Sequence, residues 1–323
     1  MSIAAIRVAA AGGPEVLTMG EVDLPSPGPG EALLRVGAAG INFIDIYRRS
    51  GVYPMSYPYT PGNEGAGSVL AVGDGVTEVA VGDRVAWSDV PGSYAAQAIG
   101  SAAKLIPVPD DVDDQQAAAL PLQGMTAHYL ASDSYRIVAG DTVLIHAGAG
   151  GVGLLLTQIA KIKGATVITT VSNSAKGELS TGAGADHVLV GYEGFPEAVR
   201  ELTGGTGVLA VYDGVGKDTF DGSLASLARR GTMVLFGGSS GQVPPFDPQR
   251  LNSGGSLSLT RPTLVDFTVT RSEILGRSQE LYGWVEDGRL DVRIGGTYPL
   301  ADAGAAQDDL ATRRTTGKLL LIP

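Results

Sequence analysis

The stretch VLIHAGAGGVGLLLTQIAKIKGATVITTV, residues Val143–Val171, contains the strongest indication of the fold of this chain. It opens with a short apolar run and continues through a glycine-rich turn. Apolar residues then recur at helical spacing, and a second run of β-branched residues follows. The pattern predicts a buried strand, a tight turn, a helix and a neighbouring parallel strand.

The turn itself has the spacing of a dinucleotide site, with Ala147, Gly150 and Gly153 each separated by two residues. A small first residue permits the turn, Gly150 lets the backbone approach a pyrophosphate, and Gly153 lets the helix pack close to the strand. Gly151 and Val152 would begin the helix, where free N–H groups and the helix dipole favour phosphate. We therefore predict dinucleotide binding in preference to a purely structural turn.

Strands and helices alternate from Asp141 onward, which predicts an α/β fold with a doubly wound parallel sheet. One of the expected helices covers residues 217–231. The segment 1–120 instead contains short β-like runs broken by Gly and Pro, and a further helix and strand close the chain. We predict a β-rich domain in two parts, 1–120 and 263–323, with a nucleotide-binding domain inserted at 121–262.

The end of the second strand distinguishes between cofactors. An NAD site usually has Asp or Glu about 20 residues after the turn, to bind the ribose hydroxyls. Here Ser172 and Lys176 occupy the segment, without a carboxylate. Because hydroxyls and an ammonium bind a 2′-phosphate, the sequence predicts NADPH, unless Lys176 is only a solvated surface lysine. Tyr192 either contacts the same adenosine end or is a surface tyrosine.

Composition excludes several other classes of function. The 323 residues are 44% hydrophobic and 18% charged, with a net charge of −11, as in a packed globular protein with an acidic surface. That charge disfavours nucleic acid. No stretch predicts membrane insertion or a signal peptide, and the lack of Cys is consistent with a cytoplasmic protein. An anionic cofactor therefore requires a local cluster of Lys and Arg.

Several motifs resemble those of one family over almost the full length. In order they are GGPEVL, GINFIDIYRRSGVYP, PGNEGAGSVLAVGDGV, VGDRVAW, HAGAGGVG and GGSLSLTRPTL. The chain resembles the quinone oxidoreductase (zeta-crystallin-like) branch of the medium-chain dehydrogenase/reductase superfamily. The resemblance implies a GroES-like catalytic domain, an inserted Rossmann-type domain and a homodimer.

The same superfamily contains zinc alcohol dehydrogenases, whose catalytic metal needs Cys or His ligands. This chain has Asn42 and Asn63 where those relatives carry ligands, and it has no Cys. Glu64 follows Asn63, and we expect it to be a buried structural carboxylate. The histidines lack metal-ligand spacing: His128, His146 and His187. We predict no metal.

The resemblance implies that three residues act close to the nicotinamide. Asn42 would hydrogen-bond the ribose or the carboxamide, and Tyr47 and Tyr53 would shape the acceptor pocket. A phenol is a poor acid near neutral pH, so these tyrosines would position the acceptor first and donate a proton second. The alternative is ordinary aromatic packing in a half-buried loop.

The resemblance implies further cofactor contacts. Arg261 and Lys318 would close over the phosphates and, with Lys176, form the required positive cluster. Arg261 could instead be a buried ion-pair residue, and Lys318 a solvated terminal lysine. The remaining implied contacts lie at the domain junction or beneath the nicotinamide: Thr126, Val215, Phe236, Gly237 and Ser239.

Three functions follow from these residues. The first is metal-independent transfer of a hydride from NADPH to a quinone, which accepts it readily because the product is aromatic. The second is reduction of an activated alkene, as in an enone or enoyl reductase, with the same cofactor. The third is a non-enzymatic binding role, which the acidic charge and the lack of an aromatic and basic stacking surface disfavour.

Overall fold

The computed structural model describes residues 2–323, which form two compact units. Unit 1 comprises the chain up to Gln123 together with Thr270–Tyr282 and Val292–Pro323. Unit 2 comprises Gly124–Val269 and Gly283–Asp291. Unit 2 is therefore inserted into unit 1, as the order of strands along the sequence indicates.

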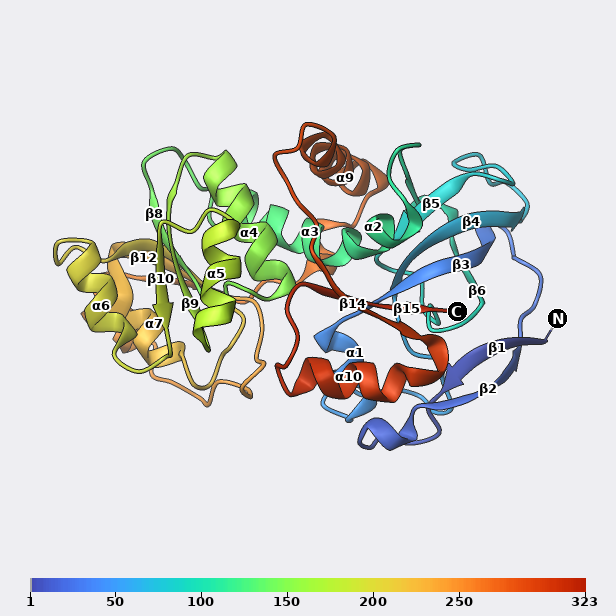
Figure 1. The fold of residues 1–323 in the computed structure, drawn as a ribbon, viewed down its shortest axis with the longest axis horizontal. Coiled ribbons are helices and arrows are strands. Elements are labelled where there is room, and N and C mark those ends of the chain that lie inside the picture. The colour runs from blue at the N-terminus through green and yellow to red at the C-terminus, as the bar shows by residue number, and fades with distance from the viewer. Residues whose placement is uncertain (1) are drawn as a thin grey trace. The chain divides into compact units, whose positions relative to one another are not determined.

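Unit 2 is built on a six-stranded, entirely parallel sheet in the order β10-β9-β8-β11-β12-β13. Numbered within the unit, this is the 3-2-1-4-5-6 order of a Rossmann fold. Figure 1 shows α4 and α5 on one side of the sheet and α6 and α7 on the other. The strands are β8 (Thr142–Ile145), β9 (Thr166–Val171), β10 (His187–Val190), β11 (Val208–Asp213), β12 (Leu227–Leu235) and β13 (Ser258–Thr260).

The helices of unit 2 bury the apolar strands on both faces, which accounts for the nearly continuous hydrophobic runs of β8 and β11. They are α4 (Gly151–Ile162), α5 (Ser174–Gly182), α6 (Phe195–Leu202), α7 (Phe220–Ser226) and α8 (Gln249–Ser253). The predicted α/β class and doubly wound sheet are confirmed.

One predicted helix is shorter than expected. We expected residues 217–231 to be helical, but α7 ends at Ser226 and β12 begins at Leu227. Leu227 pairs with Val208, and a register shift separates this pair from the rest of the β11–β12 ladder. Because it pairs with β11, the segment that contains Arg229 and Arg230 forms a strand, and Arg230 adopts φ +62. Sheet pairing overrides local helix propensity at this point.

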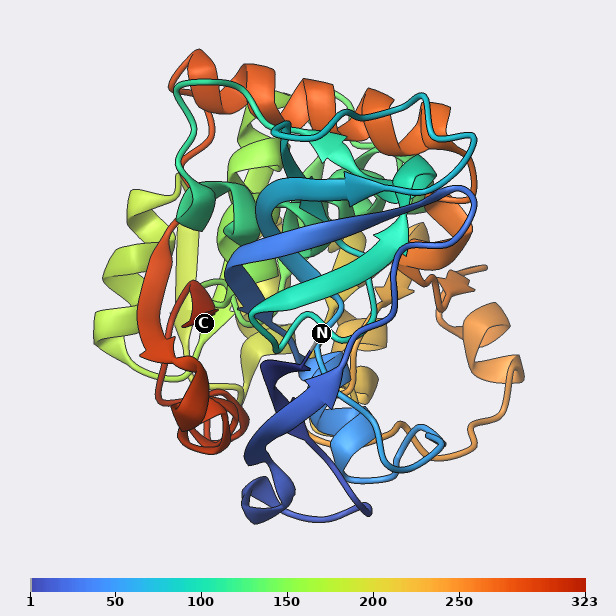
Figure 2. The ribbon, with the colours of Figure 1, turned by 90° about the vertical axis from the view of Figure 1, so that its right-hand side faces the viewer.

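Unit 1 contains a mostly antiparallel sheet in the order β14-β15-β3-β4-β5-β7, with β6 paired to β3. Figure 2 shows these strands from the side of the N-terminal residues. A separate two-stranded ribbon joins β1 to β2. The bounds are β1 (Ser2–Arg7), β2 (Thr18–Asp23), β3 (Glu31–Ile41), β4 (Glu64–Val72), β5 (Arg84–Trp87), β6 (Gln97–Ser101), β7 (Ile106–Pro107), β14 (Ile294–Pro299) and β15 (Lys318–Ile322).

The pairing of β3 with β4 and β15 positions a buried polar cluster. Gly40 pairs with Glu64 on β4 and with Leu320 on β15, so the C-terminal strand lies beside residues near position 40. A Cβ on Gly40 would lie 2.2 Å from Glu64 Oε2 and 2.8 Å from Lys318 Cε. The glycine therefore makes room for two charged side chains within the sheet.

The remaining helices are α1 (Phe43–Arg49), α2 (Asp114–Ala119), α3 (Pro121–Tyr129), α9 (Arg271–Glu286) and α10 (Ala303–Ala311). Short 3-10 turns cover Pro14–Val16, Ala102–Lys104, Leu264–Phe267 and Leu300–Asp302, and a π-helical turn covers Leu130–Ser134. Residues 263–269 and 283–291 belong to unit 2 and residues 121–123 to unit 1, although we expected the inserted domain to cover 121–262. The reason is packing: Phe267 stacks on Tyr129, Trp284 stacks on His128, and Asp291 donates its N–H to Gln158.

Candidate active site

The glycine turn of unit 2 has the geometry of a dinucleotide site. Ala147 adopts φ +53, and Gly150 is the N-cap of α4. A Cβ on Gly153 would lie 2.3 Å from the carbonyl oxygen of Ala147, closer than packing permits. Only glycine at position 153 therefore lets the first turn of α4 pack this closely against the glycine turn. The first N–H groups of the helix have no partner within it and can bind a phosphate.

Substituting Gly153 tests this close approach. We expect Gly153→Ala to lower the free energy of unfolding by about 1–3 kcal/mol, because the methyl group displaces the turn. Loss of NADPH binding should accompany it. Gly182→Ala is the matched control, since no atom lies within 4 Å of a Cβ at that helical position. Urea denaturation and cofactor fluorescence measure both effects, and equal behaviour of the two variants would contradict the assignment.

The end of β9 leads into α5 through a capped turn. Ser172 is exposed, and the side chain of Asn173 accepts the N–H of Lys176 at 3.0 Å. Lys176 is half-buried in the first turn of the helix. Tyr192 is also half-buried, with its ring 6.1 Å from that of His146. The positions of these residues allow the 2′-phosphate interaction that we predicted, and their roles remain predictions.

Residues predicted to lie beneath the nicotinamide are brought together after β11 and β12. Val215 donates its N–H to Asp213 Oδ1 at 2.8 Å, and Phe236 donates its N–H to the Asp213 carbonyl at 2.9 Å. Ser239 donates its N–H to the Gly214 carbonyl at 3.1 Å. A Cβ on Gly237 would lie 2.6 Å from the same carbonyl. The segments that follow β11 and β12 are thus held together by backbone hydrogen bonds.

Thr126 and Arg261 occupy different parts of unit 2. Thr126 is 8% exposed on α3. Arg261 follows β13, is exposed, and bonds the carbonyl of Pro262 at 3.3 Å. Its exposure contradicts the alternative of a buried ion pair and is compatible with binding a phosphate.

Unit 1 buries a three-residue cluster of Asn42, Glu64 and Lys318. Lys318 is 1% exposed and forms an ion pair with Glu64, which is fully buried. The Lys318 ammonium also donates to Asn42 Oδ1 at 2.8 Å, and Asn42 Nδ2 donates to Glu64 Oε2 at 2.7 Å. Leu122 donates its N–H to the other carboxylate oxygen at 2.7 Å. The expectation that Glu64 is a buried carboxylate is confirmed.

This cluster corrects the prediction for Lys318. We expected its ammonium to close over the cofactor phosphates, with a solvated lysine as the alternative. It is instead buried and neutralised by Glu64, so it adds no charge to a phosphate-binding surface. The positive cluster is reduced to Lys176 and Arg261. The Asn42 side chain is engaged by the same cluster, and its contact with a cofactor remains a prediction.

The residues near Glu64 do not fit a zinc ion. A catalytic zinc site needs Cys, His or carboxylate ligands with an open position. Glu64 is already bound by an ammonium and two N–H donors, and its neighbours are Asn42 and Asn63. Among residues 2–323, no group of three or more His, Asp or Glu is placed to hold a metal. The donor chemistry therefore contradicts a zinc site.

The two candidate acceptor-binding tyrosines contact each other. Tyr47, on α1, and Tyr53 have ring centroids 5.7 Å apart in an edge-on arrangement at 85°. Tyr53 donates its N–H to the Tyr47 carbonyl at 3.1 Å and remains 39% exposed. Part of the Tyr53 side chain is thus accessible to solvent, which is compatible with both predicted roles, acceptor positioning and packing.

A buried carboxylate supports the helix that carries Tyr47. Asp45 is 2% exposed and accepts the N–H of Asn42 and the hydroxyl of Tyr94, each at 2.9 Å. Burial raises the pKa of Asp45 from 3.8 to about 6, against the opposing effect of these hydrogen bonds.

This shift predicts a pH-dependent stability. The folded-state pKa of Asp45 exceeds the unfolded value. The protonated carboxyl group therefore contributes to the free energy of unfolding in full below about pH 4, and this contribution is lost as the pH rises through 6. We expect Asp45→Asn to lack this component. The unfolding free energy of the wild type relative to the variant should fall by about 3 kcal/mol between acidic and neutral pH. A difference independent of pH would contradict the prediction.

Sequence reasoning missed a polar network in unit 2. The sequence patterns exclude His146 as a metal ligand and assign no role to it or to Asp213. Both are buried, and both hydrogen-bond to Ser223. The available signal was a polar residue at the end of each of two strands whose carboxyl ends meet at the same edge of the sheet.

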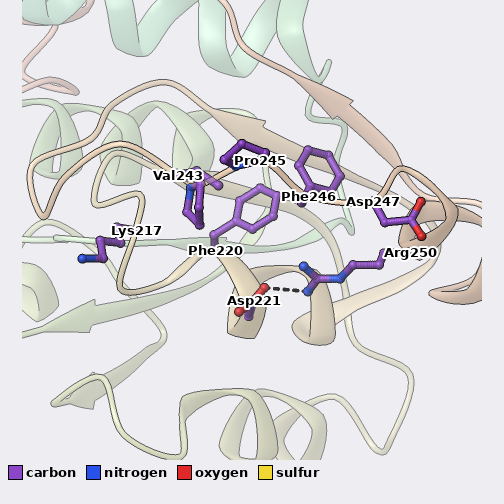
Figure 3. A pocket seen from close by; sticks show the side chains of 9 residues that line it. Lys217, Phe220, Asp221, Val243, Pro245, Phe246, Asp247 and Arg250 are labelled. Carbon is purple, nitrogen blue, oxygen red and sulfur yellow. Dashed lines mark hydrogen bonds and ion pairs between the residues drawn. The ribbon is translucent and has the colours of Figure 1, made fainter.

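A surface pocket of about 410 Å³ also lies in unit 2, and none of the residues that line it is a predicted site residue. Figure 3 shows the rings of Phe220 and Phe246 in this pocket, with Arg250 reaching Asp221. The ring centroids are 5.1 Å apart, and the ion pair is 2.6 Å long. The pocket is also lined by Lys217, Val243, Pro244, Pro245 and Asp247.

In the part of the chain that the structure describes, no helix is long and apolar enough to span a membrane.

Comparison with known proteins identifies the family. Residues 28–141 match the alcohol dehydrogenase GroES-like domain, and residues 151–277 match the family described as zinc-binding dehydrogenase. A quinone oxidoreductase of Pseudomonas aeruginosa is 43% identical over 98% of this chain and 99% of its own. A 2-haloacrylate reductase of a Burkholderia species is 42% identical, covering 97% and 96%.

A solved structure agrees with these sequence matches. The quinone oxidoreductase of Escherichia coli, complexed with NADPH, superposes with a TM-score of 0.97 at 42% identity, covering 99% of this chain and all of that one. The match extends over both units and the glycine turn. The chain therefore belongs to the quinone oxidoreductase branch of the medium-chain dehydrogenase/reductase superfamily.

Proposed function

We propose that this protein is an NADPH-dependent quinone oxidoreductase that works without a metal. The observation that carries the proposal is a dinucleotide turn, closed by Gly153, followed by a second strand that ends in Ser172 and Lys176 without a carboxylate. The solved relative complexed with NADPH supports the same cofactor.

The cofactor residues of unit 2 have distinct roles in this proposal. The turn from Ala147 to Gly153 and the N-terminus of α4 bind the pyrophosphate. Ser172 and Lys176 bind the 2′-phosphate, Arg261 contributes charge, and Tyr192 contacts the adenosine. Val215, Phe236, Gly237 and Ser239 support the nicotinamide, and Thr126 completes the cofactor contacts.

When bound, NADPH supplies a hydride to the acceptor. Tyr47 and Tyr53 position the acceptor ring through their aromatic side chains, and Asn42 orients the nicotinamide end of the cofactor. Alignment and exclusion of water are the main requirements for a quinone, because its reduction forms an aromatic ring. A tyrosine hydroxyl is the proposed source of any proton that the product takes from the protein.

Oxidation of NADPH and of NADH should be followed in parallel on chelator-treated protein, with 1,4-benzoquinone and a 2-enone as acceptors. We expect rapid oxidation of NADPH by the quinone, slower oxidation of NADH, and no effect of the chelator. Loss of quinone turnover after chelation would contradict the metal-free proposal.

Reduction of an activated alkene is the second candidate function. The 42% identical relative is named a 2-haloacrylate reductase, and the same hydride reaches a carbon–carbon double bond. Turnover of the 2-enone without turnover of the quinone, in the assay above, would favour this function over the first.

We also propose that the protein acts as a homodimer in the cytoplasm. The family resemblance supports the dimer, and a chain of 323 residues without Cys is compatible with a reducing compartment. Light scattering combined with size-exclusion chromatography measures the oligomeric state, and a monomeric mass would contradict this part of the proposal.

A further inference from the structure

A continuous chain of buried hydrogen bonds links three strand ends of unit 2. Thr170 Oγ1 lies 2.7 Å from His146 Nδ1, and His146 Nε2 lies 2.9 Å from Ser223 Oγ. Ser223 donates to Asp213 Oδ2 at 2.8 Å, and Thr219 donates to the same oxygen at 2.7 Å. All five side chains are at most 1% exposed.

The partners determine where each proton lies. Ser223 has one hydroxyl hydrogen, and it points to Asp213, so the Ser223 oxygen accepts from His146. Burial lowers the pKa of His146, with Asp213 opposing, and a neutral imidazole has one N–H. That N–H is therefore on Nε2, and Nδ1 accepts the hydroxyl of Thr170.

Asp213 connects this chain to the segments assigned to the nicotinamide end. Its Oδ1 accepts the N–H groups of Val215 at 2.8 Å and Gly216 at 2.9 Å. Its carbonyl accepts the N–H groups of Phe236 at 2.9 Å and Gly237 at 3.3 Å. One residue thus holds both segments at the end of β11.

His146 and Thr170 connect the chain to the segments assigned to the phosphates. His146 directly precedes Ala147, the first residue of the glycine turn. The backbone N–H of His146 donates to the Tyr212 carbonyl at 3.0 Å. Thr170 lies in β9, just before the segment that begins at Ser172. The ring of Phe195 packs edge-on against the imidazole at 4.9 Å, which fixes the plane of the ring.

We propose that His146, protonated on Nε2, is a positioning residue that couples the phosphate-binding segments of unit 2 to its nicotinamide-binding segments. It holds the glycine turn, the β9 end and the β11 end in the arrangement that binds NADPH. This inference rests on the proposed function, because it assigns to His146 the alignment of that cofactor.

The first test is a long-range ¹H–¹⁵N correlation spectrum of protein labelled at histidine, recorded without cofactor. The three histidines are distinguished by their substitution, and we expect His146 to carry its proton on Nε2. In Ser223→Ala, which removes the acceptor, the resonances of His146 should shift or show tautomer exchange. A proton on Nδ1 in the wild type would overturn the inference.

The second test is a double-mutant cycle with Thr170→Val and Ser223→Ala, read as the dissociation constant of NADPH. We expect each variant to weaken binding about two- to tenfold. The double variant should weaken binding by less than the product, because the loss through the imidazole is common to both variants, while Ser223 also contributes its own bond to Asp213. Thr170→Ser, which keeps the hydroxyl, should restore binding. Ser226→Ala is the matched control, because Ser226 bonds only its own helix at Gly222.

The outcomes separate this inference from the proposed function. Wild-type affinity for NADPH in Ser223→Ala, or single effects that multiply in the double variant, would overturn the role of His146 while the proposed function stands. Failure of the wild type to bind NADPH would overturn both. The effect on turnover should lie in KM for NADPH and not in kcat, whereas a general loss of folding would lower the active fraction and kcat.

Discussion

Replacing Lys318 with Met should lower the free energy of unfolding by about 3–5 kcal/mol, the cost of leaving a buried charge without its partner. Glu64 is fully buried, and the ammonium of Lys318 is its counter-charge. The methionine fills a similar volume but leaves the carboxylate with N–H donors alone. Urea denaturation at neutral pH measures the loss.

Two further variants separate the charge effect from packing. The double variant Glu64→Gln/Lys318→Met removes both charges and should regain most of the lost stability. Lys161→Met breaks a half-exposed ion pair with Asp186, at side-chain exposures of 35% and 36%, and should cost about 1 kcal/mol or less. Equal losses in Lys318→Met and Lys161→Met would contradict the prediction.

Replacing Lys176 with Ala should raise KM for NADPH by about ten- to a hundredfold, because a charge-assisted bond to the 2′-phosphate contributes roughly 1.5–3 kcal/mol. KM for NADH should change little, since that cofactor has no 2′-phosphate. Steady-state kinetics with both cofactors and one quinone measure the selectivity.

Lys163→Ala is the control for this prediction. Lys163 is the C-cap of α4, at the opposite end of the helix from the glycine turn, so its removal changes the net charge equally. Its kinetic constants should match those of the wild type. An equal rise in KM for NADPH and NADH in Lys176→Ala would show that Lys176 does not bind the 2′-phosphate.

The sequence predicted the fold through local patterns. The spacing of Ala147, Gly150 and Gly153 between an apolar run and a helical period required a strand, a turn and a helix in that order. The same kind of argument was wrong where tertiary pairing prevailed, as at Leu227, where β12 replaces the end of an expected helix. Helix propensity depends on neighbouring residues alone, so it could not indicate the competing pairing with β11.

The Rossmann-type sheet, its glycine turn and the absence of Cys ligands could all be predicted from the sequence, because each depends on residues close together in the chain or on composition. The partners of Lys318 and His146 could not, because they depend on how distant strands pair. Lys318 meets Glu64 because β15 and β4 both pair with β3. His146 meets Ser223 because the ends of parallel strands converge at one edge of the sheet. Such contacts join residues distant in sequence, and no local pattern encodes them.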